Sequence, residues 1–159
     1  MTAVKTEPLP ARALAPGEGE ARWWFGQLAV IKATAEDTDG GFTLVEITAG
    51  PGYETPLHIH HDEDEGFWMI DGSATFTVGQ ETVEAGPGAY LFGPKDVPHK
   101  WRAGADGARM LYLFTPSGFE EMIREMSVPA EELTPPPPDV GPPDNFVEIA
   151  ARYGIELLL

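Results

Sequence analysis

Residues 52–72 read GYETPLHIHHDEDEGFWMIDG and hold three of the four histidines of the chain. In a β-strand, alternate side chains project to the same face, so His58 and His60 share one side of their strand. The acidic run Asp62–Asp64 predicts a tight loop that returns the chain, and Glu65 can then face the same interior. The stretch therefore predicts two imidazoles and one carboxylate that point into a barrel.

The same alternation places aromatic side chains beside this polar group. With Glu65 pointing inward, Phe67 and Met69 point inward too, whereas Trp68 and Ile70 lie on the opposite face. The expected site is a polar end on an aromatic substrate pocket. Its candidate lining residues are Phe67, Met69 and Trp101. Trp101 is included because it lies two positions after His99 and so shares its face of the strand.

Two motifs of the chain resemble those of the cupin superfamily. The first is a Gly, five residues, His-x-His, three or four residues, Glu, six residues and Gly, and it is matched by Gly52, His58, His60, Glu65 and Gly72. The second is a Gly, five residues, Pro-x-Gly, two residues, His, three residues and Asn, and it is matched by Gly88, Pro94 and His99. Asp96 replaces its central Gly, and Asp tolerates turn geometry. Ala103 replaces its Asn, which puts a local hydrogen bond in doubt but no metal ligand.

The resemblance implies an all-β fold, a cupin jelly-roll (double-stranded β-helix) barrel that encloses one divalent metal ion. It implies these metal ligands: His58, His60, Glu65 and His99. The His-x-His-His run, the aromatic residue that follows Glu65 and a helix ending near residues 152–154 are similar to the quercetin 2,3-dioxygenase-like branch of the single-domain cupins.

The donor types support a metal on their own account. Three imidazoles and one carboxylate suit Fe, Mn, Ni, Co or Zn and leave coordination positions open for a substrate. The chain has no cysteine, which excludes thiolate ligands. The alternative, four polar side chains buried together without a cation, is costly. We expect His61 on the surface or in contact with the ligands, and residues 62–64 in a solvated loop, with Asp64 as the lesser alternative ligand.

The remaining sequence predicts a meander of strands followed by helices. Short apolar runs separated by turn residues predict strands at Trp24–Thr34, Phe42–Ala49, Leu57–His61, Glu65–Ile70, Ala74–Val78, Thr82–Ala85, Ala89–Phe92, His99–Arg102 and Arg109–Thr115. Asp71-Gly72 and Gly79-Gln80 are predicted hairpin turns. Helices are expected only near the end of the chain.

Three regions are expected. Residues 1–21 form a loosely held N-terminal arm, residues 22–116 the barrel, and residues 117–159 two helices joined by a proline-rich strap. A capping box at Ser117 and Glu120 predicts the start of the first helix, and Asn145 the start of the second. Both helices have one apolar face, which favours docking on the barrel.

Composition limits the classes of partner. The net charge is −16 with only ten Lys and Arg, which argues against nucleic acid. No segment approaches the ~18 consecutive apolar residues of a membrane span, and no signal peptide is recognised, so we expect a cytoplasmic location. The apolar face at Trp68 and Ile70, together with residues 23–25, favours a homodimer.

The expected function is that of a metal-dependent dioxygenase for a small aromatic or enolic substrate chelated on the metal beside O₂. Glu65 is the expected catalytic residue, both as ligand and as general base. Two alternatives stay open on the sequence. One is a non-redox enzyme of natural-product metabolism, such as an aromatic polyketide cyclase or an isomerase, and the other is a small-molecule-binding protein without turnover.

Overall fold

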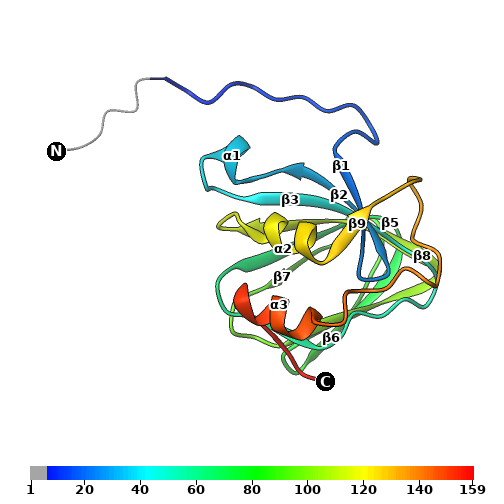
Figure 1. Cartoon of the computed structure of the whole chain (residues 1–159). Helices are drawn as coiled ribbons and strands as arrows, with labels where there is room; N and C mark the ends of the chain where they lie inside the picture. The colour runs from blue at the N-terminus through cyan, green and yellow to red at the C-terminus, as the bar shows by residue number, and fades with distance from the viewer. Residues whose placement is uncertain (1–6) are drawn as a thin grey trace.

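The computed structural model describes residues 7–159. The first six residues of the predicted arm therefore lie outside the described residues. Residues 7–19 have no helix or strand, and they run as a thread away from the body of the protein (Figure 1). One contact of this thread is an ion pair between Arg12 and Asp37, with 3.2 Å between Nη1 and Oδ1.

The described chain forms ten strands and three short helices. In chain order these are β1 (Glu20–Trp24), β2 (Gln27–Ala33), α1 (Ala35–Thr38), β3 (Thr43–Ala49), β4 (His58–His60), β5 (Asp64–Val78), β6 (Glu81–Ala85), β7 (Tyr90–Gly93), β8 (His99–Thr115), α2 (Phe119–Glu125), β9 (Ser127–Pro129), α3 (Phe146–Arg152) and β10 (Ile155–Leu157). Among residues 7–159, no helix is long and apolar enough to cross a membrane.

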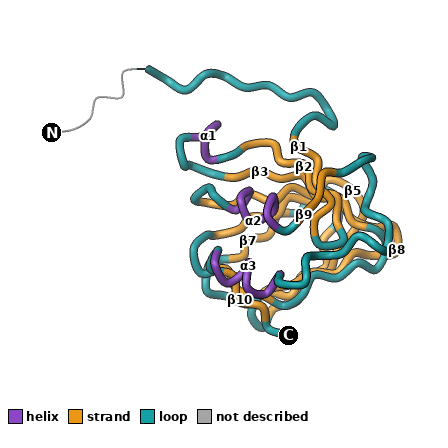
Figure 2. The backbone as a smooth tube through the Cα atoms, in the orientation of Figure 1, coloured by secondary structure: helices purple, strands orange, loops and turns teal. Residues whose placement is uncertain are grey.

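All ten strands belong to one antiparallel sheet that rolls into a barrel (Figure 2). Its main path is β10-β4-β8-β3-β2-β1-β9, and β5 pairs with β6, β7 and β8. The long strands β5 and β8 pair along their whole lengths, from Asp64 opposite Thr115 to Val78 opposite His99. Both strands continue through the register shifts at residues 69–74, so one long pair of strands runs through both ends of the barrel sheet. The predicted all-β jelly-roll fold is confirmed.

The predicted hairpin at Asp71-Gly72 is wrong. The chain continues through these residues as β5, and the register with β8 shifts on either side of them. Gly72 has φ +72°, and a Cβ there would lie 2.2 Å from the Gly107 carbonyl oxygen of β8. A β-bulge with a glycine in the left-handed region needs the same positive φ as a primed turn, so the dipeptide alone does not separate the two. The second predicted hairpin, at Gly79-Gln80, is confirmed, since Val78 pairs with Glu81.

Other strand boundaries also differ from the prediction. The predicted strand Trp24–Thr34 corresponds to β2, which begins only at Gln27. Trp24 ends β1, and Phe25 and Gly26, with φ of 51° and 79°, form the turn that joins the two strands. Phe is an unusual residue for positive φ, so Gly26 is the one turn signal there. The two predicted strands within residues 99–115 are one strand, β8.

Four short elements were not predicted: α1, β1, β9 and β10. Helix α1 is a single turn capped by Thr34 and Asp37, so helices are not confined to the end of the chain. Strands β9 and β10 have three residues each and pair with β1 and β4. Elements of this length contain too few residues to show a periodic pattern.

The two C-terminal helices pack on the barrel. Phe119, Met122 and Ile123 of α2 are buried, as are Ile149 and Ala150 of α3. The apolar faces predicted from the sequence are therefore the faces that dock. Helix α3 begins after Asn145, as predicted, and it is followed by Gly154 with φ +73°.

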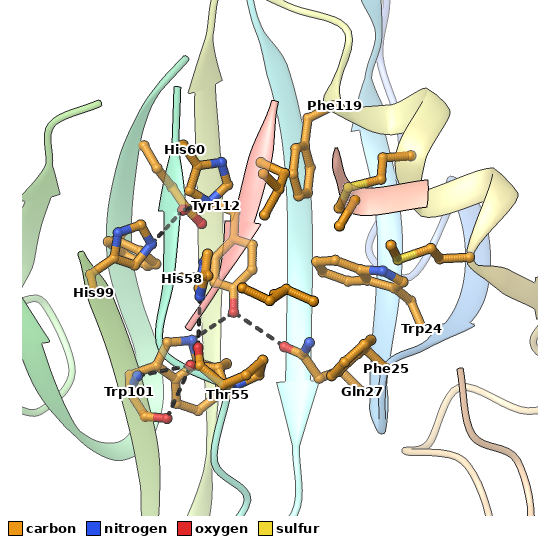
Figure 3. A pocket seen from close by; sticks show the side chains of 18 of the residues that line it. Trp24, Phe25, Gln27, Thr55, His58, His60, His99, Trp101, Tyr112 and Phe119 are labelled. Carbon is orange, nitrogen blue, oxygen red and sulfur yellow. Dashed lines mark hydrogen bonds and ion pairs between the residues drawn. The ribbon is translucent and has the colours of Figure 1, made fainter. Parts of the chain in front are cut away.

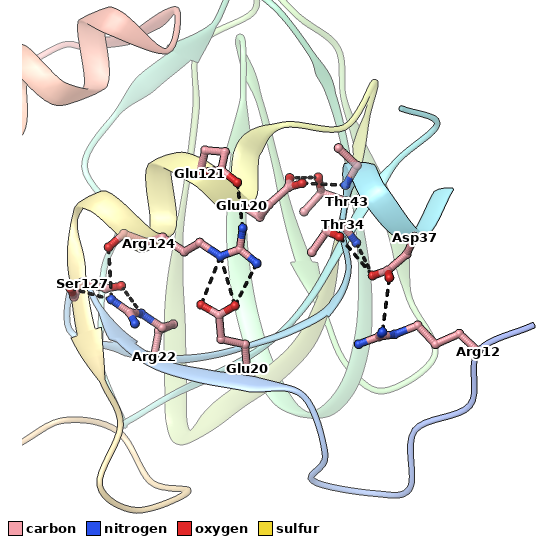
Figure 4. A network of polar contacts seen from close by, with 11 residues as sticks. Arg12, Glu20, Arg22, Thr34, Asp37, Thr43, Glu120, Glu121, Arg124 and Ser127 are labelled. Carbon is pink, nitrogen blue, oxygen red and sulfur yellow. Dashed lines mark hydrogen bonds and ion pairs between the residues drawn. The ribbon is translucent and has the colours of Figure 1, made fainter. Parts of the chain in front are cut away.

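The predicted capping box of α2 is wrong. The N-cap is Gly118, and the Ser117 side chain forms no cap. The Glu120 carboxylate instead accepts a hydrogen bond from the Thr43 hydroxyl (Figure 4). It also accepts hydrogen bonds from the backbone N–H groups of Ala35 and Gly118. It is 1% exposed, and it ties α1, β3 and α2 together. Burial alone would raise the pKa of Glu120, but these hydrogen bonds outweigh it and lower the pKa.

Glu120→Gln is expected to lower the free energy of unfolding at pH 7 by about 1–3 kcal/mol, because the amide places N–H groups against donors that the carboxylate accepted. Since the pKa is lower in the folded state, the carboxylate stabilises above its unfolded pKa and loses this effect as the pH falls through its folded pKa. The deficit of the variant should therefore shrink on acidification. Urea unfolding from pH 7 down to pH 3 measures it.

The exposed neighbour Glu121 provides the control. Glu121→Gln should change the free energy of unfolding by less than about 0.5 kcal/mol, because its ion pair with Arg124 is solvated. A Glu120→Gln deficit that stays constant across the pH range would contradict the role assigned to the ionised carboxylate.

Candidate metal centre

Four side chains from three strands converge inside the barrel. His58 and His60 lie on β4, Glu65 on β5 and His99 on β8. Each offers one ligand atom, and these atoms all lie within 4.8 Å of one another. The structure thus brings together the four residues that the resemblance named as metal ligands. A group of this size and composition could hold a metal ion.

Strand pairing sets the positions of the ligands. His58 of β4 lies directly opposite His99 of β8. The other edge of β4 pairs with β10, where Ile155 lies opposite His60 and Leu157 opposite His58. Strand β4 has only three residues, so the C-terminal strand supplies most of its backbone partners. The end of the chain therefore supports two of the candidate ligands.

Hydrogen bonds orient two of the rings. His58 Nδ1–H donates to the Pro56 carbonyl at 2.7 Å, and His60 Nδ1–H donates to Glu63 Oε1 at 2.7 Å. In both rings Nε2 is then the nitrogen that can bind a metal, in the form that carries no proton on it. Glu63 is 7% exposed, so the acidic run is not the fully solvated loop expected from the sequence.

The surroundings of Glu65 fit a cation. Glu65 Oε2 lies 3.0 Å from His60 Nε2 and 3.0 Å from His99 Nε2. His60 Nε2 is buried and has no hydrogen-bond partner among residues 7–159. A divalent ion between these atoms would satisfy both the lone pair of His60 and the charge of Glu65. The donor set of three imidazoles and one carboxylate suits the metals named above.

The charge states agree with this arrangement. Burial, with repulsion from His99 and His60, lowers the pKa of His58 to about 3, so its ring is neutral at pH 7. Burial also acts to lower the pKa of His60, but Glu65 and Glu63 outweigh it and raise that pKa to about 9. Burial would raise the pKa of Glu65, and the contacts with His60 and His99 lower it instead. A proton on His60 thus balances the carboxylate charge, and a cation could replace that proton.

A cavity opens from this group into the barrel (Figure 3). Phe67 and Trp101 line it, together with Tyr112. Met69 is fully buried but does not line the cavity. The walls are mostly aromatic and aliphatic, and the polar groups are few, which is typical of a small-molecule site.

The structure adds lining residues that the sequence does not reveal. From β1 and the turn after it come Trp24 and Phe25, and from the C-terminal region come Phe119, Met122 and Ile155. These residues carry only packing signals in the sequence, and they reach the cavity because the chain folds back over it. The C-terminal segment therefore forms one wall of the cavity.

His61 lies outside the group. Its side chain is 43% exposed, with Nδ1 at 2.7 Å from Asp96 Oδ1 and Nε2 at 2.9 Å from Glu156 Oε2. Neighbouring His60 points inward, as strand alternation requires. His61 thus links the loop that carries Asp96 to β10.

Comparisons with known proteins agree with the fold. The Cupin domain family model matches residues 45–115. Quercetin 2,3-dioxygenase from Bacillus subtilis (strain 168) is 30% identical over 148 residues, which are 91% of this chain and 44% of that protein. The chain thus spans less than half the length of this curated relative.

Two solved structures extend the comparison. An oxalate decarboxylase from Bacillus subtilis with Mn(II) centres is 29% identical, with a TM-score of 0.56 over 64% of this chain and 28% of its own. KdgF from Halomonas sp. is 19% identical, with a TM-score of 0.55 over 60% of this chain and 84% of its own, and it supports the fold alone.

Proposed function

We propose, since the chain belongs to the cupin superfamily, that it is a metal-dependent dioxygenase for a small aromatic or enolic substrate. The observation that carries the proposal is the convergence of His58, His60, Glu65 and His99 on an aromatic cavity. The similarity to quercetin 2,3-dioxygenase supports this class of reaction.

The residues of the site would have three different roles. The three histidines and Glu65 would hold the ion, and Glu63 would keep the His60 ring in its ligand orientation. A bound divalent metal would supply an electrophilic centre that binds an enolate or phenolate oxygen and, if redox-active, O₂. Phe67 and Trp101 would form the walls along the substrate ring, and they exclude bulk water from it.

Metal analysis and oxygen uptake test the proposal together. The protein is purified without added metal, its native ion is identified by mass spectrometry, and O₂ consumption is followed with a panel of flavonols and simpler enols. Iron, manganese or nickel with O₂ uptake supports the dioxygenase. Zinc with anaerobic turnover supports a non-redox cyclase or isomerase instead. Metal without turnover of any substrate supports a binding protein.

We also propose a homodimer, formed through the outer face of β5 and β7. Trp68 and Tyr90 lie directly opposite each other on these strands, 48% and 59% exposed, and Phe92 is 52% exposed. Trp23 and Trp24 do not contribute as the sequence suggested, because both are buried. A self-complementary apolar face of this kind suits a two-fold contact.

Sedimentation at micromolar concentration should therefore show a species of twice the 17.2 kDa chain mass. The double variant Trp68→Lys with Tyr90→Lys should sediment as a monomer, because each lysine places a charge in the contact. Val147→Lys, at a 49% exposed position on α3, is the matched control and should remain dimeric. A wild-type monomer would rule out the dimer.

The cytoplasmic location stays a prediction of the sequence.

A further inference from the structure

A chain of hydrogen bonds lies along the cavity wall, apart from the candidate metal ligands (Figure 3). Trp101 Nε1 lies 2.7 Å from the Tyr112 hydroxyl oxygen, and this oxygen lies 3.1 Å from Gln27 Oε1. All three side chains are buried and line the cavity. They come from β8 and from β2, which are separated in the sheet by β3.

The direction of these hydrogen bonds follows from the donors available. An indole N–H can only donate, so the Tyr112 oxygen accepts from Trp101. The single hydroxyl proton of Tyr112 is then free to donate to Gln27, whose carbonyl oxygen must face it. Burial raises the pKa of Tyr112 well above its ordinary value, so the proton stays on the phenol. The orientation of the Gln27 amide is therefore fixed, with its NH₂ group turned away from Tyr112.

The NH₂ group of Gln27 is available to a ligand. The Gln27 side chain lines the cavity, and its one hydrogen bond within residues 7–159 is the one that Oε1 accepts from Tyr112. Nε2 is not among the fully buried atoms of these residues that lack a partner, so the NH₂ group is open to the cavity. Because Gln27 lines the cavity, an acceptor could reach the amide through that cavity.

We propose that Gln27 is a second polar anchor of the cavity, which selects an elongated aromatic ligand with a hydrogen-bond-accepting oxygen remote from its metal-binding oxygens. The metal-binding end rests on the proposed function. Gln27 is on β2 and the candidate ligand His99 is on β8. The backbones of these two strands are two strand spacings apart, roughly 10 Å along the sheet at about 4.8 Å per strand. The walls between the two polar ends are aromatic, so the middle of the ligand is flat and apolar.

Binding of two flavonols to the metal-loaded protein under anaerobic conditions tests this anchor. Quercetin and 3-hydroxyflavone share the chelating 3-hydroxy-4-ketone, but only quercetin carries hydroxyl oxygens on its outer rings. In the wild type, quercetin should bind about 10-fold or more tightly than 3-hydroxyflavone, a difference of one buried hydrogen bond. In Gln27→Leu this preference should disappear, with the affinity for 3-hydroxyflavone changed less than about threefold.

Two further variants keep the test independent of folding defects. Gln27→Glu keeps the shape and still accepts from Tyr112, but it has no N–H to donate, so it should lose the preference as well. Tyr112→Phe leaves the amide free to turn and should reduce the preference in part. Thermal melting and metal content are measured for each variant.

The outcomes separate this inference from the proposed function. Equal loss of affinity for both flavonols in Gln27→Leu, or no loss for quercetin, would overturn the anchor and leave the dioxygenase proposal intact. Quercetin binding that depends on Gln27 but not on the metal would support the anchor and overturn chelation. If neither flavonol binds the metal-loaded wild type, the anchor proposal is wrong, and O₂ uptake with the simpler enols decides the dioxygenase proposal.

Discussion

His58→Ala, His60→Ala and His99→Ala are each expected to leave the purified protein with little or no metal, against one ion per chain in the wild type. Each substitution removes one bond from a four-ligand site whose ligand atoms lie within 4.8 Å of one another. The remaining three donors hold the ion too weakly to survive gel filtration. Metal content by mass spectrometry, with circular dichroism to confirm the fold, measures the effect.

Two other side chains provide a graded comparison. Glu63→Gln should weaken metal affinity about 10-fold to 100-fold, because it removes the carboxylate that orients His60 and leaves the ligands in place. His61→Ala should leave the metal content near normal, since that ring bonds to Asp96 and Glu156 on the surface. Loss of metal from His61→Ala together with retention in His58→Ala would show that the ligand assignment is wrong.

The centre of this site could be predicted from sequence because its geometry is local. Two-residue alternation fixes which way His58 and His60 point, and the same rule carries from Glu65 to Phe67. Trp68, on the opposite parity, is 48% exposed, as the rule requires. Strand alternation is independent of how the rest of the chain folds, so residue spacing alone is enough to predict these orientations.

The parts that the sequence does not reveal depend on contacts between distant segments. The last strand, β10, pairs with the strand that carries His58 and His60, almost one hundred residues away. Gln27 became a candidate anchor only through its contact with Tyr112, 85 positions later. Neither β10 nor Gln27 lies in a local sequence pattern that predicts its role, because a contact between distant segments leaves no periodic signal in the sequence.

The role of Glu63 was missed for a different reason. A run of acidic residues is usually a solvated loop, and that interpretation holds for its neighbour Asp62, which is exposed. Glu63 turns inward because the His60 ring offers a buried N–H within reach. The useful signal was its spacing, three residues after a histidine that faces the interior.

Glu65→Gln is expected to slow turnover some 10²-fold to 10⁴-fold at full metal occupancy, the usual range for removal of a general base. The carboxylate has two oxygens, so one can bind the ion while the other accepts the hydroxyl proton of a bound substrate. The amide keeps the shape but cannot accept that proton. Substrate affinity of the reloaded variant should stay within a few-fold of the wild type, as measured by anaerobic titration.

The acidity of the substrate shows whether Glu65 acts as a general base or only as a metal ligand. A flavonol whose 3-hydroxyl pKa lies well below the assay pH, for example one with a nitro group on its phenyl ring, arrives already ionised and needs no base. Glu65→Gln should therefore turn over this substrate much faster, relative to the wild type, than it turns over 3-hydroxyflavone. If Glu65 only holds the ion, the variant loses rate equally and modestly on both substrates. That result would remove the base from the proposed mechanism and favour a centre in which the metal acts as a Lewis acid alone.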